Sequence, residues 1–359
     1  MCTYIYFGLN GEQAPKDTTD VTIGNSVTVI NAGVFTKCHE SLERVIMYDN
    51  VITIENDAFR SCEALEYITF SRNLVQIGNN ALLDCHALGA IFLPSSLRTI
   101  GNDAFKGCSS LRFLSVPATI EVLGSGIVSD CRELLTDSER SRDDHPMQLS
   151  NSDEIHHWLM HRHDDFPLHR VCYSANVTAQ DIDACITAHG IQYACTVDDQ
   201  QMTALHVLSA NPQATPEAIS ACYYANPKAA TMLDNDGSIP IHYLCEYNPS
   251  LLRNLSWLGR EKGCFEVDNL EGFTPLDVLA ADDNSGLLPV SVAVKHNIKW
   301  GNGMQYVIEE NMVAREWNCL VEKDPETGLH TFMLAAVGRD ADLSTVFKLL
   351  LVNPGLIIR

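Results

Sequence analysis

The chain has 359 residues, 46% of them hydrophobic, so it is long enough for two domains with apolar cores. Its formal net charge of −22 argues against nucleic acid or an anionic membrane as a partner, because both require clustered Lys and Arg. No segment reaches the roughly 18 apolar residues of a membrane span, and the start MCTYIYFGLNGEQ lacks the features of a signal peptide. We therefore expect a cytoplasmic protein with free thiols.

A repeat with a period of 23 residues runs through the first third of the chain. Five cysteines are spaced by 24, 23, 23 and 23 positions: Cys38, Cys62, Cys85, Cys108 and Cys131. Each copy contains a short alternating segment that predicts a half-buried strand, and a polar corner such as Gly78-Asn79-Asn80, whose residues tolerate left-handed backbone. One copy cannot bury its apolar face alone, so stacked copies are predicted to form a β-solenoid of about five coils.

Residues 93–111 resemble the BspA-type leucine-rich repeat nearly residue for residue, and the resemblance covers about residues 21–136. We place an N-terminal cap segment before it, at residues 1–20. Leu82 and Val128 replace the Phe of this family in the third and fifth copies, so we expect those coils to be packed less fully. The cysteine column is expected to fill buried corners, because one Cys per coil gives a line and not a tetrahedral metal site.

A linker and a histidine-rich segment follow the coils. Residues 137–152 are charged, lack apolar periodicity and are predicted to be the linker. In the cluster from His156 to His163, the metal-ligand candidates are His157, His161 and His163, since the first two would share one face of a helix. Trp158 stands where the HExxH motif of zinc proteases has its general base. We expect a solvated helix face without a metal, and keep a metal-binding protein or metal-dependent enzyme as an alternative.

A second repeat of about 36 residues begins with Phe-Pro-Leu-His at positions 166–169. It returns at residues 203–206, 239–242 and 274–277, and in degenerate form from residue 330. Each tetrad is predicted to begin a helix, and a second helix follows it. The first such helix has the outline of a capping box at Thr178 and Asp181, with Gly190 as its stop, and Thr215-Pro216 repeats this opening one unit later.

The tetrads resemble the Thr-Pro-Leu-His signature of ankyrin repeats. This resemblance implies an ankyrin-like helical array over residues 153–359, with an irregular insertion at about residues 283–325. It also implies that His169, His206 and His242 hold the loops of adjacent repeats together by hydrogen bonds. Leucine-rich coils followed by such helix pairs resemble repeat proteins that are abundant in diatom-type algae.

The sequence thus predicts an α+β repeat protein, with a leucine-rich-repeat β-solenoid followed by an α-helical ankyrin-like array. No phosphate-binding loop, nucleophile elbow or acid–base pair of carboxylates is recognisable, so we expect no enzyme activity, no catalytic residue and no cofactor. The expected function is a protein–protein interaction scaffold with protein partners. A cell-surface adhesive role is a further alternative if the true N-terminus carries a signal peptide.

The predicted contact surface is the outward face of the longer strands. On that face Tyr67, Phe92 and Phe113 would form an aromatic patch of the kind enriched at binding hot spots, although aromatic residues also favour strands for their own sake. The candidate protein-binding residues are Arg44, Ile46, Tyr67, Thr69, Phe92, Phe113 and Ser115.

Overall fold

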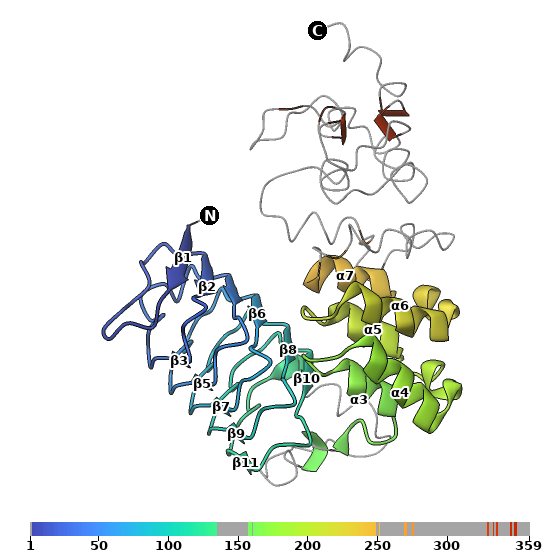
Figure 1. Ribbon diagram of the computed structural model, residues 1–359, viewed down its shortest axis with the longest axis horizontal. Coiled ribbons are helices and arrows are strands. Elements are labelled where there is room, and N and C mark those ends of the chain that lie inside the picture. The colour runs from blue at the N-terminus through green and yellow to red at the C-terminus, as the bar shows by residue number, and fades with distance from the viewer. Residues whose placement is uncertain are drawn as a thin grey trace, which may run out of the picture. The chain divides into compact units, whose positions relative to one another are not determined.

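The computed structural model describes residues 2–134, 157–159 and 161–248, and a few isolated residues beyond them (Figure 1). The predicted linker at 137–152, the insertion at 283–325 and the repeats predicted after residue 270 lie outside the described residues, apart from isolated positions. The chain divides into two compact units. One unit comprises Met1–Gln200 with Asn211–Ala214, and the other comprises Gln201–Ala210 with Thr215–Arg359.

In the described part of the first unit, three sheets of short parallel strands, arranged as two ladders, build a β-solenoid (Figure 1). One ladder has the order β1 (Thr3–Tyr6), β2 (Asp20–Ile23), β4 (Arg44–Ile46) and β6 (Tyr67–Thr69), while β8 (Ala90–Phe92) pairs with β10 (Phe113–Ser115). The other ladder has the order β3 (Val29–Ile30), β5 (Thr53–Ile54), β7 (Gln76–Ile77), β9 (Thr99–Ile100) and β11 (Val122–Leu123). From β2 onward each coil contributes one strand to either side, which confirms the predicted solenoid of about five coils.

The repeated apolar columns form one continuous core inside the coils. Leu82 and Val128 are as fully buried as Phe59, so their burial gives no sign of looser packing in those coils. The five column cysteines are also buried, as the repeat pattern predicts. The thiol of Cys85 donates to the carbonyl oxygen of Phe59 at 3.3 Å, and Cys108 and Cys131 make the equivalent bond to the preceding coil. Burial raises the pKa of the thiols of Cys38, Cys62, Cys85 and Cys131, for Cys38 to about 11, so these four are protonated at neutral pH.

The polar corners show why glycine recurs there. The left-handed residue of the corner is Asn80 or Asp103, with φ of 53° and 52°, and not the glycine two positions earlier. A Cβ at Gly101 would lie 2.5 Å from the backbone nitrogen of Asn79 in the preceding coil. The left-handed backbone predicted for the polar corner is therefore found at its third residue, and the glycine is required by the close approach between coils.

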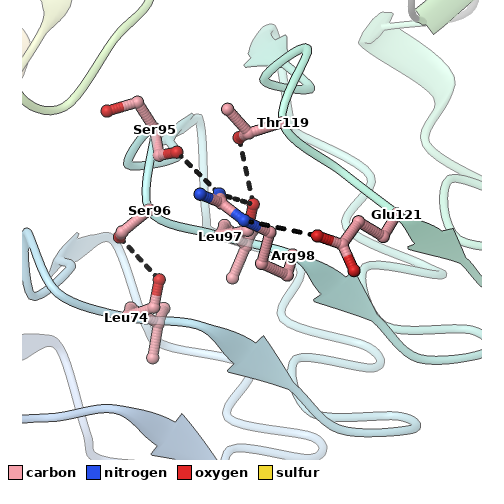
Figure 2. Close-up of polar contacts among 7 residues, drawn as sticks. All are labelled: Leu74, Ser95, Ser96, Leu97, Arg98, Thr119 and Glu121. Atoms are coloured by element: carbon pink, nitrogen blue, oxygen red, sulfur yellow. Dashed lines mark hydrogen bonds and ion pairs between the residues drawn. The ribbon is translucent and has the colours of Figure 1, made fainter.

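Side-chain hydrogen bonds connect each coil to the next. Asn56 and Asn79 accept the backbone N–H one coil further along at 2.8 Å through Oδ1, and Asn102 does so at 2.9 Å. Figure 2 shows a second set near β9. The hydroxyl of Ser96 donates to the carbonyl of Leu74 at 2.7 Å, and Thr119 donates to Leu97 at 3.0 Å. The serine and threonine bonds satisfy backbone carbonyls that the turns leave without a ladder partner, and the asparagine bonds satisfy backbone N–H groups.

Both ends of the solenoid core are covered. At the start, the buried ring of Tyr6 packs edge-on against Phe35, with 5.8 Å between centroids. At the other end Leu159 is part of the core and Trp158 packs against it. Repeat arrays need such caps, because a terminal coil otherwise exposes an apolar face.

A helix pair follows in the same unit (Figure 1). It consists of α3 (Pro167–Cys172) and α4 (Ala179–His189), followed by the 3-10 helix η1 (Ile191–Ala194). The backbone N–H of Asp181 donates to the Thr178 hydroxyl, and the Asp181 carboxylate accepts the N–H of Thr178, which confirms the predicted capping box. Gly190, with φ of 105°, ends α4 as predicted.

The second unit contains a further helix pair and the start of another. Its described elements are α5 (Ala204–Ala210), α6 (Pro216–Ala225), the 3-10 helix η2 (Pro227–Thr231) and α7 (Pro240–Tyr247). Thr215 caps α6 by accepting the N–H of Ala218, and Pro216 takes the first helical position, as the sequence predicts. Among the described residues, no helix combines the length and the apolar character that a membrane crossing needs.

The corner packing yields a test. Gly101→Ala should destabilise the solenoid by about 1–3 kcal/mol or more, because the added methyl group meets backbone atoms that cannot rotate away. Urea unfolding followed by circular dichroism measures this loss. Arg60→Ala, at an exposed position two coils away, should change the transition by no more than about 1 kcal/mol. Equal midpoints for the two variants would show that the coils are not in such close contact.

Candidate protein-binding surface

The strand face, defined as the outward side of β1, β2, β4, β6, β8 and β10, carries the two predicted columns. Arg44 lies beside Tyr67 and Ile46 beside Thr69 in the register of β4 and β6. Further along, Phe92 lies beside Ser115. The columns therefore exist, but the exposure of their members differs sharply from one end to the other.

The aromatic residues of β8 and β10 are buried. Phe92 is 1% exposed and Phe113 is 0% exposed. Tyr173, which directly follows α3, stacks on Phe92 with 5.8 Å between centroids and lies tilted over Phe113 at 6.5 Å. The N–H of Ala175 also donates to the carbonyl of Leu93. The expectation of an exposed aromatic patch is therefore wrong for Phe92 and Phe113, because the turn after α3 covers them.

Residues 211–214, which belong to the same unit, cover the neighbouring strand β6 and the residue that follows it. The amide of Gln213 donates to the carbonyl of Phe70 at 2.6 Å and accepts its N–H at 3.3 Å. The hydroxyl of Tyr67 contacts the carbonyl of Pro212 at 3.5 Å, and burial raises the pKa of Tyr67, although the nearby charge of Arg44 opposes this. Tyr67 thus marks the border of the covered area.

The other predicted residues differ in their exposure to solvent. Thr69 is buried, and its hydroxyl accepts the N–H of Met47 at 3.1 Å, which is a structural role. Ser115 is half-buried. Arg44 is exposed, with its guanidinium 5.6 Å from the centre of the Tyr67 ring.

The uncovered part of the strand face is apolar. Four large side chains, which we call the open patch, are exposed there: Ile5 by 48%, Phe7 by 57%, Ile46 by 44% and Tyr48 by 48%. Ile5 and Ile46 lie in one column on either side of Thr22. Phe7 lies over Gly24, where an added Cβ would be 3.7 Å from its ring. Apolar side chains that cluster on a protein surface commonly mark an interaction site, so the open patch is the candidate contact surface.

Sequence reasoning missed Ile5, Phe7 and Tyr48. Residues 1–20 fall outside the 23-residue period, and the predicted outward columns begin at Arg44 and Ile46. The alternation of residues 3–7 was the available signal, since it places Thr3, Ile5 and Phe7 on one side of a strand and the two tyrosines on the other.

The candidate metal ligands do not converge. The rings of His157 and His161 lie 4.5 Å apart between centroids, as their spacing predicts, and His161 contacts Asp164 at 2.7 Å. His163, however, is buried and stacks on Tyr173 at 4.5 Å. Within the described part of the chain, no three His, Cys, Asp or Glu side chains are grouped so that they could hold a metal ion. His156 lies outside that part.

A cation–aromatic cluster surrounds His163 instead. The guanidinium of Arg162 lies 4.8 Å from the ring centre of Trp158 and 5.7 Å from that of Tyr173. Its Nε donates to Nε2 of His163 at 2.8 Å. Burial, reinforced by the Arg162 charge, lowers the pKa of His163 well below its usual value. The imidazole is therefore neutral and serves as an acceptor.

The tetrad histidines are buried structural groups. Nδ1 of His206 accepts the N–H of Thr203 at 3.0 Å, and Nε2 donates to the carbonyl of Ser238 in the next turn at 3.2 Å. This is the bridging role that the ankyrin resemblance implies. His242 accepts the N–H of Ile239 in the same way, and His169 is fully buried. All three are too enclosed to act as general bases on a substrate.

Residues 14–135 match the family description "BspA type Leucine rich repeat region" in six copies. The N-terminal part of the chain is a BspA-type leucine-rich-repeat region. A helical region follows it, and the family is typically non-catalytic. A search of curated proteins finds no match to the chain.

Two solved structures resemble part of the chain. A leucine-rich repeat protein from Bacteroides ovatus ATCC 8483 is 22% identical with a TM-score of 0.28, and the match covers 33% of this chain and 36% of that one. A leucine-rich repeat protein from T. pallidum is 23% identical with a TM-score of 0.29, covering 39% of this chain and 74% of that one. The chain thus spans about a third of the length of the Bacteroides ovatus protein.

The covering of the strand face can be tested by truncating Tyr173. Tyr173→Ala should destabilise the first unit by about 3–5 kcal/mol, because it leaves a cavity over Phe92 and Phe113. Hydrogen exchange in β8 and β10 should rise in parallel. Tyr224→Ala, at a position that is 73% exposed, is the matched control and should change stability by less than about 0.5 kcal/mol. Unchanged exchange in Tyr173→Ala would contradict the covering.

The lowered pKa of His163 predicts acid sensitivity. Below the ordinary histidine pKa of about 6.5, His163 is protonated in the unfolded chain but stays neutral in the native protein. The free energy of unfolding therefore falls as the pH falls, by up to about 1.4 kcal/mol per pH unit. His163→Gln keeps an acceptor for Arg162 and should flatten the stability profile between pH 7 and 5. His189→Gln, at an exposed position, controls for the loss of a histidine. Parallel profiles for wild type and His163→Gln would refute the assignment.

Proposed function

We propose that the protein is a non-catalytic interaction scaffold that binds a protein partner through the open patch. The observation that carries this proposal is the exposure of four large apolar side chains on one face of a parallel sheet: Ile5, Phe7, Ile46 and Tyr48. Arg44 borders the patch and supplies a charged group next to the apolar area. Aromatic and arginine side chains of this kind are the usual anchors of protein interfaces.

The rigidity of the sheet favours binding. Each strand is held by ladder bonds to its neighbours, and the N–H groups of Glu43 and Arg44 both donate to the carbonyl of Thr19. The patch side chains therefore stand on a preorganised surface, and a partner that buries them does not also have to order the backbone beneath. Burial of the exposed apolar side chains then favours association, because less free energy is lost in ordering the interface.

The helix pairs are proposed to be ankyrin-like. Three features support this: the spacing of the tetrads, the proline at the first helical position of α3 and α7, and the bridge from His206 to Ser238. We also propose a cytoplasmic location, for which the buried, reduced thiols of the coils are the supporting feature.

Paired substitutions test the proposed function. Ile46→Ala with Tyr48→Ala should weaken the affinity for a direct partner about tenfold or more, because two exposed anchors of the interface are lost. Ile52→Ala with Val122→Ala is the matched control. It removes two exposed apolar side chains at the other ladder, one directly before β5 and one in β11. Proximity labelling in the native cell supplies the partners, and binding constants of purified pairs measure the effect. Equal affinities for both double variants, with the fold intact, would contradict the proposal.

A further inference from the structure

The strand β1 has an open edge. Among the strands that the structure describes, only β2 pairs with β1. The N–H groups of Asp20 and Gly24 donate to the carbonyls of Cys2 and Tyr6. Alternate residues of a parallel strand bond to the same neighbour, so Thr3, Ile5 and Phe7 direct their N–H and C=O groups away from β2. This edge is a row of backbone donors and acceptors next to the open patch.

A carboxylate closes one end of this edge and leaves the other end open. Glu12 accepts the N–H of Phe7 at 2.9 Å and that of Leu9 at 2.8 Å, and it also accepts the hydroxyl of Tyr4 at 2.7 Å. The carboxylate oxygens occupy the position that the carbonyl of a further strand would take. Partial burial opposes ionisation, but these hydrogen bonds outweigh it and lower the pKa of Glu12. Within the described part of the chain, the edge is therefore open at Thr3 and Ile5, and it ends at the negative charge of Glu12.

The surroundings of the edge are apolar and acidic. Ile5, Phe7 and Leu9 are all exposed. Asp20 lies beside Thr3 in the register of β1 and β2. Residues 1–36 contain the acidic Glu12, Asp17 and Asp20 and one basic residue, Lys16. A strand that pairs here gains from positive charge and from apolar side chains on alternate positions.

We infer that β1 accepts an extended, basic segment of a partner protein as an added strand. The segment hydrogen-bonds to the backbone of Thr3 and Ile5, places every second side chain against Ile5 and Phe7, and brings Lys or Arg close to Asp20 and Glu12. Recognition by strand addition takes its affinity from the backbone and its specificity from alternate side chains. This inference rests on the proposed function, since it names the kind of protein ligand, but it concerns the edge of the sheet and not its face.

A second copy of the chain fits this edge poorly. Residues 2–10 contain no Lys or Arg, so two β1 edges would meet without charge complementarity. Each copy also carries a net charge of −22, which repels the other at low salt. A heterologous basic strand has neither disadvantage.

A peptide that alternates Val or Ile with Lys or Arg over eight residues is the probe for this inference, used with the full chain. Fluorescence anisotropy should show binding that weakens about tenfold when Glu replaces the basic residues. N-methylation of one alternate set of peptide nitrogens should abolish binding, while methylation of the other set should preserve it, because only one set faces β1. Absence of binding, or equal effects of the two sets, overturns the inference.

Variants of the protein separate the edge from the face. Thr3→Pro removes an outward N–H without removing a bond to β2, and it should weaken peptide binding about tenfold relative to Thr3→Ala. Circular dichroism verifies that both variants fold. Ile46→Ala with Tyr48→Ala should leave peptide binding within about twofold, since these side chains lie two strands away. Loss of binding in the face variant alone would overturn strand addition and leave the proposed function standing. Self-association that Thr3→Pro abolishes would assign the edge to a second copy instead.

Discussion

Hydrogen bonds between equivalent positions of adjacent coils are the constraint on which the rest of the structure depends. The N–H of Gly78 donates to Ile54, that of Gly101 to Ile77 and that of Gly124 to Ile100, all at 2.8–2.9 Å. Because each bond joins residues about one repeat apart, every column of the sequence becomes a column in space. The buried cysteines, the asparagine series and the strand face all follow from this alignment.

The strand face has two different uses along its length. At β6, β8 and β10 it is a packing surface, because the turn after α3 and residues 211–214 lie on it. At β1, β2 and β4 the same columns end in exposed apolar side chains. The aromatic residues predicted to bind a partner, Phe92 and Phe113, therefore pack against the chain's own helix pair. The candidate contact surface lies on the first coils and at the edge of β1.

The periodic parts of this structure could be predicted from the sequence, and the rest could not, for physical reasons. Coil number, inward columns and the capping box at Thr178 follow from local patterns of the sequence. The bridge made by His206 is what the resemblance of the tetrads to ankyrin repeats implies. The burial of Phe92 depends on Tyr173, which has no periodic relation to it. His163 likewise turns inward because an aromatic ring and an arginine enclose it, which its spacing from His161 does not encode. The exposure of Ile5 was not predicted, because residues 1–20 lie outside the repeat.

Hydroxyl-radical footprinting of the native full chain tests this division of the strand face most directly, since it reports the solvent exposure of individual side chains. The structure predicts rapid oxidation of Phe7 and Tyr48, and protection of Phe92, Phe113 and Tyr173 until the chain is unfolded. Oxidation of Phe92 and Phe113 at rates similar to that of Phe7 would contradict it, because the helix pair would then leave the strand face open along its whole length.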